Sequence, residues 1–297
     1  MCDDEKSIKN NDSKTDSHQD AKDDASQYPN PPKILRVKDP PYLHHKPLHP
    51  HLPQPPALVL LCSPVKTGKS TLISNLLLNS AFYGQDYFDQ VYIVSNTINN
   101  DDTSRFLKQA YDCQDHYDDS LIEEIIHKQN RFEKKDMPEI AIVLDDVLGS
   151  IKTGAYINKL STRFRHSNIK LLLFSSQVFK SVSNVIRQNL THLIIGSPFA
   201  NKSELLKIAI EFGDMFGGTD NFLRIYTIAT PSRYDFLYCD LQSNPPLAYH
   251  CFEYLIAEGP NIIKGGTDSG ENQNTAINTL QNEAAAMAGK SGKSESI

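Results

Sequence analysis

Short, strongly apolar runs recur through the middle of this 297-residue chain, and segments with helical spacing or room for a helix separate them. Runs that are apolar at nearly every position are typical of strands buried on both faces, and their alternation with helices indicates βαβ order. The pattern predicts an α/β fold in which helices flank a mainly parallel central sheet. The predicted strands are ALVLLC (57–62), FDQVYIVS (88–95), IAIVLD (140–145), KLLLFSS (170–176) and THLIIG (191–196).

Beyond the last of these runs, the pattern predicts a helix near residues 202–212 and then two further apolar stretches. These are FLRIYTI (222–228) and YDFLYCD (234–240), and they flank the turn-forming sequence ATPSR (229–233). Two apolar runs around a short loop are typical of a β-hairpin. We expect this hairpin at one edge of the sheet, towards the C-terminal end of the folded part.

Both ends of the chain differ from its middle in composition. Residues 1–27 hold eight acids and four bases with scarcely an apolar residue, residues 28–56 are rich in proline, and the C-terminal end is rich in Gly, Ser, Asn and Ala. Such segments bury too little apolar surface to fold alone. We expect a disordered arm over 1–56, acidic and then proline-rich, a folded domain over 57–260, and a flexible low-complexity tail over 261–297.

Charge divides the chain in a similar way, because residues 1–28, at −4, and residues 258–297, at −2, together carry the whole formal net charge of −6, and the residues between them sum to zero. No apolar run approaches the roughly 18 residues of a membrane span, so we expect a soluble chain without a transmembrane segment. The five cysteines form no C-x-x-C pair, which indicates a reducing compartment and neither a zinc site nor a disulfide framework. Four histidines in the proline-rich arm could bind a metal, although no fixed element orients them: His44, His45, His49 and His51.

The first candidate for chemistry is SPVKTGKS (63–70), which follows a predicted strand and precedes a predicted helix over 70–79. It fits the phosphate-binding loop G-x-x-x-x-G-K-[ST], except that Ser63 replaces the first glycine. Gly68 would allow a tight turn against the phosphates, Lys69 would neutralise the β- and γ-phosphates, and the hydroxyl of Ser70 would reach Mg²⁺. The alternative is a turn in which GKS is accidental. The predicted nucleotide-binding residues are Ser63, Pro64, Val65, Lys66, Thr67, Gly68, Lys69, Ser70 and Thr71.

The second candidate is the acid pair Asp145 and Asp146 at the end of the strand IAIVLDDV. Ligands bind at the carboxyl ends of strands in open α/β sheets, and alternation along the strand points the two carboxylates in different directions. We expect Asp145 to hold the Mg²⁺ shell beside Ser70 and Asp146 to orient or deprotonate the attacking water. The alternative is a pair of solvated turn residues that cap the strand.

A third candidate, Gln177, ends the strand KLLLFSS. If that strand lies between the phosphate-loop strand and the Asp145 strand, the amide of Gln177 would project between the γ-phosphate and the attacking water. The alternative is that Gln177 only hydrogen-bonds a loop at the sheet edge.

A basic segment is the fourth candidate, because residues 147–203 contain eight Lys or Arg and no Asp or Glu. Cations on a helix near 151–163 and on the loop after it would meet DNA phosphates without reading bases. The alternative is that these bases pair with the acids of residues 112–139 on a neighbouring face. The candidate DNA-binding residues are Lys152, Lys159, Arg163 and Arg165, and the remaining bases are Lys170, Lys180, Arg187 and Lys202.

The order and spacing of these elements over about residues 57–240 resemble the genome-packaging ATPases of large DNA viruses and virophages, the vaccinia-type branch of the HerA/FtsK superfamily. The likeness includes the double aspartate, the Arg165-His166 pair before SNIKLLLFSSQ, the strand-ending glutamine, IRQN (186–189), and FDQVYIVSNT followed by DDT (101–103). Ser63 and Lys66 depart from the pattern. The N-K-x-D motif of GTPases and the later motifs of DEAD-type helicases are absent from the sequence.

This resemblance implies a P-loop NTPase fold of the RecA-like type with an additional strand, and an Mg²⁺-dependent motor that hydrolyses ATP. It implies a homo-oligomeric ring that threads double-stranded DNA, without sequence preference, into a capsid. Capsid or internal-membrane vertex proteins are the implied partners, and the host-cell cytoplasm or a viral factory, with retention in the virion allowed, is the implied location. The alternatives are a non-packaging DNA pump of the same superfamily and a nucleotide-binding scaffold with little turnover.

Within this resemblance, Arg187 matches the IR-x-N element by type and place. It would act as an arginine finger that reaches the γ-phosphate of a neighbouring subunit. The alternative is a surface arginine paired with an acid.

Overall fold

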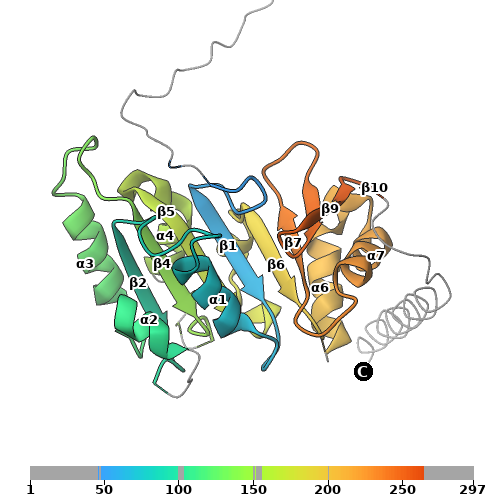
Figure 1. Cartoon of the computed structure of the whole chain (residues 1–297), viewed down its shortest axis with the longest axis horizontal. Helices are drawn as coiled ribbons and strands as arrows, with labels where there is room; N and C mark the ends of the chain where they lie inside the picture. Colours follow the sequence, from blue (N-terminus) through green and yellow to red (C-terminus); the bar gives the residue numbers. More distant parts are fainter. Residues whose placement is uncertain are drawn as a thin grey trace, which may run out of the picture. The chain divides into compact units, whose positions relative to one another are not determined.

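A ten-stranded mixed sheet forms the centre of the computed structural model, which describes residues 46, 48–99, 104–149, 151, 156–199 and 201–263 (Figure 1). The strand order is β10-β9-β8-β7-β6-β1-β5-β4-β2-β3. The strands are β1 (Ala57–Cys62), β2 (Gln90–Ser95), β3 (Asp112–Gln114), β4 (Ile140–Asp145), β5 (Ile169–Ser176), β6 (His192–Gly196), β7 (Phe236–Asp240), β8 (Leu247–His250), β9 (Tyr254–Glu258) and β10 (Asn261–Ile262).

The half of the sheet from β6 to β3 is parallel, and the half from β7 to β10 is antiparallel. All residues of β1, β4, β5 and β6 are buried, which is the burial that their continuous apolar sequences predict. Strand β5 lies between β1 and β4, so one additional strand separates the phosphate-loop strand from the Asp145 strand, which is the condition set for the role of Gln177 and the arrangement that the resemblance implied.

Helices and 3₁₀ turns cover both faces of the sheet. They are α1 (Lys69–Leu78), α2 (Arg105–Ala110), α3 (Asp119–Gln129), α4 (Tyr156–Arg163), η3 (Phe164–Ser167), η4 (Phe179–Ser181), α5 (Asn184–Gln188), α6 (Lys202–Phe212), η5 (Gly213–Phe216) and α7 (Thr219–Ala229). Alternate residues of β1 point to opposite faces: Leu58 and Leu60 pack in the core under α3 to α7, and Val59 and Leu61 pack in the core under α1 and α2. The sheet is therefore buried on both sides, as an α/β fold requires.

A C-terminal antiparallel hairpin is present, as predicted, but β7 and β8 form it, and the prediction of a strand over residues 222–228 is wrong. Residues 222–228 lie within helix α7, and β7 pairs instead with β8 and with β6. The buried residues of α7 follow helical spacing: Phe222, Leu223, Ile225, Tyr226 and Ala229. The richness of this stretch in β-branched and aromatic residues concealed that spacing.

Part of the proline-rich arm packs onto the domain. Leu52 is buried, the hydroxyl of Tyr83 donates to the Pro53 carbonyl over 2.5 Å, and His51 Nδ1 lies 3.0 Å from the Phe252 carbonyl. The packed chain thus begins earlier than the expected boundary at 57. The acidic arm, His44, His45 and the tail from 264 lie outside the described residues. Among the helices that the structure describes, none has the length and apolarity to cross a membrane.

Candidate nucleotide-binding site

The loop between β1 and α1 has the backbone that a phosphate-binding loop requires. Gly68 adopts a φ of +90°, a conformation that L side chains rarely adopt, and helix α1 begins at the next residue. Lys66 also has a positive φ, of 60°. Ser63 is not among the described residues with a positive φ, so this position does not depend on glycine for its backbone conformation.

Ser63 instead fills a space that a neighbouring glycine leaves open. It is 1% exposed, its hydroxyl hydrogen-bonds that of Thr67, and its backbone N–H donates to the Ser176 carbonyl over 3.0 Å. A Cβ atom on Gly196, the last residue of β6, would lie 2.0 Å from Ser63 Oγ. Serine is therefore accommodated at position 63 because the adjacent strand carries a glycine there, and the hydrogen bond from the Ser63 hydroxyl to that of Thr67 stabilises the loop.

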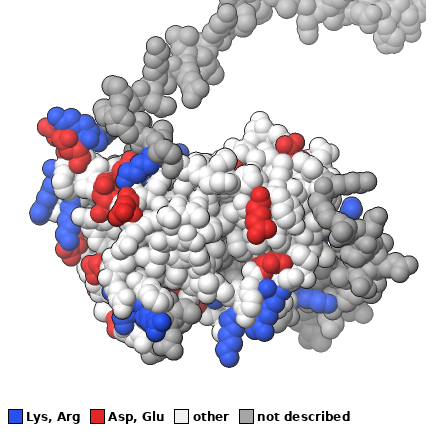
Figure 2. Space-filling view, viewed as in Figure 1, with Lys and Arg blue, Asp and Glu red and all other residues white. Residues whose placement is uncertain are grey.

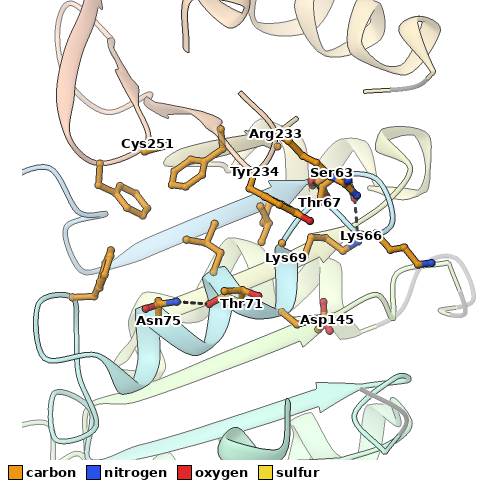
Figure 3. Close-up of a pocket in the computed structure, with 18 of the residues that line it drawn as sticks. Ser63, Lys66, Thr67, Lys69, Thr71, Asn75, Asp145, Arg233, Tyr234 and Cys251 are labelled. Atoms are coloured by element: carbon orange, nitrogen blue, oxygen red, sulfur yellow. Dashed lines mark hydrogen bonds between the residues drawn. The ribbon is translucent and has the colours of Figure 1, made fainter. Parts of the chain in front are cut away.

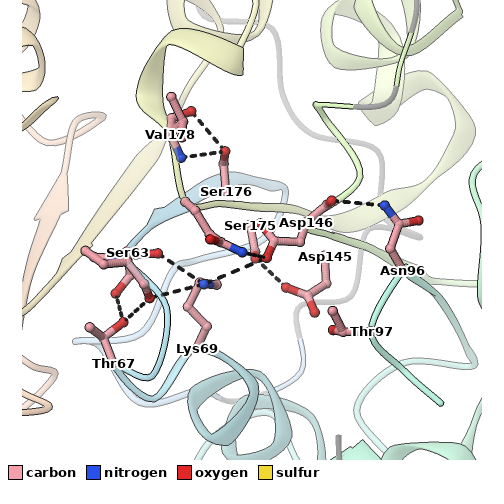
Figure 4. A network of polar contacts seen from close by, with 12 residues as sticks. Ser63, Thr67, Lys69, Asn96, Thr97, Asp145, Asp146, Ser175, Ser176 and Val178 are labelled. Carbon is pink, nitrogen blue, oxygen red and sulfur yellow. Dashed lines mark hydrogen bonds and ion pairs between the residues drawn. The ribbon is translucent and has the colours of Figure 1, made fainter. Parts of the chain in front are cut away.

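Lys69 places its ammonium group inside the loop (Figure 4). Its Nζ donates to the carbonyls of Ser63 over 3.1 Å and Pro64 over 3.2 Å, and it lies 4.0 Å from Asp146 Oδ2. The side chain is only 10% exposed. A cation held at this depth by uncharged carbonyls and one carboxylate is placed to neutralise a bound phosphate group.

The two aspartates at the end of β4 point to different surroundings, as their alternation predicted. Asp145 is buried and accepts hydrogen bonds from the hydroxyls of Ser95, over 2.8 Å, and Ser175. Burial raises the pKa of Asp145, although both hydroxyls act in the opposite direction. Asp146 has a φ of 56° and turns its carboxylate towards Lys69.

Gln177 follows β5 and contacts the same acid, since its Nε2 donates to the carboxylate of Asp146. The structure thus brings together Asp146 and Gln177, which directly follow β4 and β5, and Lys69, the first residue of α1 after the loop that follows β1. The contact follows from the strand order, because β5 separates the other two strands and Gln177 extends from its carboxyl end.

One cavity of about 1280 Å³ joins these groups to an apolar region (Figure 3). Both aspartates, Gln177 and every predicted loop residue except Pro64 line it. Ser70 and the two aspartates offer hydroxyl and carboxylate oxygens to the same space, a donor set that fits Mg²⁺. Beyond Thr71, helix α1 and the aromatic side chains of Phe82, Phe236 and Phe252 leave room for an uncharged, flat group such as a nucleobase.

Arg187 does not line this cavity. Its guanidinium pairs with the carboxylate of Glu211 on α6 and lies over the ring of Phe179, 4.9 Å from the centroid. The placement matches the alternative of an arginine paired with an acid within its own chain.

The basic segment divides into paired and unpaired cations. Lys170 is buried and lies 3.2 Å from Glu139, as the pairing alternative predicted. Lys159, Arg163 and Arg165 are exposed on α4 and η3, and they form no ion pair with a described residue. Lys152 lies outside the described residues.

Arg233 and Tyr234 are among the cavity-lining residues that the sequence did not indicate. They lie in the turn between α7 and β7, and Tyr234 Cδ1 is 3.5 Å from the position of a Cβ atom on Gly68. The segment was expected to be the turn of a hairpin at one edge of the sheet, and no role at the phosphate loop was predicted for it. The signal that identifies it is the pairing of β7 with β6, which returns the chain to the edge where the loop lies.

Comparisons with known proteins agree on the fold. No family model matches the sequence, and no curated protein matches it. The crystal structure of B204, the DNA-packaging ATPase from Sulfolobus turreted icosahedral virus, is 15% identical, with a TM-score of 0.50 over 66% of this chain and 98% of that chain. B204 from Sulfolobus turreted icosahedral virus 2 in complex with sulfate gives 16% identity and a TM-score of 0.47 over 65% of this chain and 95% of that chain.

EssC (ATPases 2 and 3) from Geobacillus thermodenitrificans gives 14% identity and a TM-score of 0.42 over 76% of this chain and 44% of that chain. At these identities the likeness concerns the fold alone, and of these three structures the first B204 structure has the highest TM-score. Together with the strand order and the loop geometry, it shows that this chain has the α/β fold of the P-loop NTPases.

Proposed function

We propose that this protein is an ATP-hydrolysing, DNA-translocating motor of the HerA/FtsK superfamily. The observation that carries the proposal is the convergence of the phosphate loop, Asp146 and Gln177 on one cavity from three adjacent strands. The sequence resemblance to the vaccinia-type branch, and the fold likeness to a DNA-packaging ATPase, favour packaging of double-stranded viral DNA into a capsid as the work of this motor.

Each side chain has a distinct task in ATP hydrolysis. Lys69 neutralises the β- and γ-phosphates, and the left-handed backbone at Gly68 directs the N-terminus of α1 at the same anion. When bound, Mg²⁺ would be held through Ser70 and Asp145 and would withdraw charge from the phosphate oxygens. Asp146 accepts the proton of the attacking water at a carboxylate oxygen, and Gln177 fixes that carboxylate by donating to it.

The exposed cations of α4 and η3 support the DNA part of the proposal. Lys159 and Arg163 are four residues apart and share one face of α4, and Arg165 follows in η3. On the face shown in Figure 2, Lys and Arg form separate small groups around the rim rather than one broad basic surface. A few phosphate contacts per subunit suit a motor that holds DNA without sequence preference and then releases it, because each contact is weak and reversible.

Steady-state ATP hydrolysis by the full chain, with and without double-stranded DNA, tests the catalytic part. Lys69→Ala should abolish turnover and strongly weaken ATP binding, whereas Lys128→Ala, a matched change on exposed α3, should leave both unchanged. Unchanged turnover in Lys69→Ala would contradict the site assignment. A wild-type chain that binds ATP without hydrolysing it would instead favour the scaffold alternative.

Salt dependence tests the DNA part. DNA of any sequence should stimulate hydrolysis, and the stimulation should fall steeply as salt rises. The double change Lys159→Gln with Arg163→Gln should reduce the stimulation and flatten its salt dependence while basal hydrolysis stays near its starting value. Lys128→Gln with Lys135→Gln is the matched control on exposed residues beyond the basic segment. Co-purification with a major capsid protein would distinguish packaging from another kind of DNA pump.

A further inference from the structure

Arg233 is a cation of the nucleotide cavity that has no acidic partner. It lines the cavity with the phosphate loop, and it forms no hydrogen bond or ion pair with any residue that the structure describes. Its guanidinium carbon lies 5.0 Å from the centroid of the Tyr234 ring. Arg187, by contrast, is neutralised by Glu211 outside the cavity.

The topology of the sheet places Arg233 beside the phosphate loop. Ile195 of β6 pairs with Cys62, the last residue of β1, and Gly196 pairs with Phe236, the first residue of antiparallel β7. Residues that precede Phe236 therefore emerge at the edge where β1 opens into the loop. Figure 3 shows Arg233 and Tyr234 extending from this turn over the loop, above Lys69.

The turn is held in a defined shape. The Asp235 carboxylate accepts from the Ser232 N–H over 2.7 Å, and the Asp235 N–H donates to the Ser232 carbonyl over 3.3 Å. Tyr234 adopts a φ of 77°, which is uncommon for a residue with a large side chain, and its ring packs against Gly68. Strained backbone of this kind persists where the surrounding structure fixes it, which is common at ligand sites.

We propose that Arg233 is a phosphate-binding residue that acts in cis, from the same chain as the phosphate loop, and that Tyr234 presents its guanidinium to the polyphosphate of the nucleotide. This inference rests on the proposed function, since it assumes that the cavity binds ATP. A guanidinium forms paired hydrogen bonds to phosphate oxygens, which the single ammonium group of Lys69 cannot do. The two cations would then contact the polyphosphate from two sides, Lys69 from within the loop and Arg233 from above it.

Equilibrium binding of ATP and of inorganic tripolyphosphate to the full chain tests this. Arg233→Ala should weaken the binding of both ligands, raising each Kd by roughly ten- to a hundredfold, which is the range expected for a lost hydrogen bond to a charged group. Arg233→Lys should recover part of the loss, because it keeps the charge without the paired hydrogen bonds. Arg224→Ala is the matched control, since Arg224 is an exposed arginine on α7 that does not line the cavity, and it should bind both ligands as the wild type does.

Three outcomes would overturn the inference. If Arg233→Ala binds ATP as tightly as Arg224→Ala does, Arg233 does not contact the nucleotide. If Arg233→Ala weakens the binding of ATP but not that of tripolyphosphate, Arg233 contacts the ribose or base and not the phosphates. A wild-type chain that binds neither ligand would overturn the proposed function as well. A wild-type chain that binds ATP without hydrolysing it would overturn only the proposal of a motor. The inference about Arg233 could still be tested, because the comparison of its variants requires only nucleotide binding.

Discussion

Gly196→Ala should destabilise this protein through a single contact, the one with Ser63. The new Cβ would lie 2.0 Å from Ser63 Oγ and 2.8 Å from Ser63 Cβ, well inside the van der Waals separation of about 3.5 Å. Ser63 has little freedom to move, because it is 1% exposed and its hydroxyl and backbone N–H are both hydrogen-bonded. Strands β1 and β6 must separate, or the loop must shift, at a cost of about 1–3 kcal/mol.

The cost is measurable by urea unfolding of the full-length variants, and a second change at the same contact tests its cause. Gly149→Ala is the matched control, since no heavy atom lies within 4 Å of the Cβ position at Gly149. In the Gly196→Ala background, Ser63→Ala should restore part of the lost stability, because the clash between the two Cβ atoms remains, and Ser63→Gly should restore most of it.

Ser63→Gly alone should cost about 1 kcal/mol, for the lost hydrogen bond to Thr67. The two changes should therefore be strongly non-additive when they are combined. Equal stability of Gly196→Ala and Gly149→Ala would refute the reasoning. So would a failure of Ser63→Gly to restore the Gly196→Ala variant.

Three further predictions concern other parts of the site and the core. Asp146→Asn should preserve Mg-ATP binding and stop hydrolysis in single-turnover assays, and the same behaviour in Asp145→Asn instead would exchange the two roles. Arg187→Ala should lower the free energy of unfolding by about 1 kcal/mol and leave ATP affinity unchanged, because it breaks the pair with Glu211; loss of turnover without loss of stability would restore the finger role. Burial lowers the pKa of His192 to about 4, so the unfolded chain binds this proton first and stability should fall by up to about 3 kcal/mol as pH falls from 6.5 to 4. Urea unfolding at stepped pH should show that His192→Asn removes this slope.

Five strands of the parallel half, β1, β2, β4, β5 and β6, were predictable because they are wholly or mostly buried, whereas the short and partly exposed β3 was missed. A fully buried strand such as β4 is apolar at every position before its terminal Asp145, and such runs are easily located in a sequence. The antiparallel half was harder, since residues 222–228 satisfy both a strand composition and a helical spacing. The length of this segment distinguishes a strand from a helix only when the elements that pack against it are known. The packing of Leu52 was also hidden, because a single apolar residue in a proline-rich segment carries no periodicity.

The candidate site divides in the same way into local and long-range parts. The loop from 63 to 71 and the acid pair at 145 and 146 each lie within one short segment, so their spacing alone indicated them. Gly196 and the serines that hold Asp145 come from other strands, and Arg233 comes from the turn before β7. Their positions depend on the order and direction of those strands in the sheet. No spacing within one segment could reveal them.

The same strand order connects the nucleotide site to the basic residues. The chain continues from Asp146 through residues 147–155 into α4, which carries Lys159 and Arg163. It continues from Gln177 through η4 into α5, and there the Ser183 hydroxyl donates to Asn158 Oδ1 on α4 over 2.5 Å. Asp146 and Gln177, which contact each other beside Lys69, therefore lead into two helices that also contact each other. In the proposed motor, movement of either residue on loss of the γ-phosphate would reach the DNA-facing side of α4 by a short covalent route.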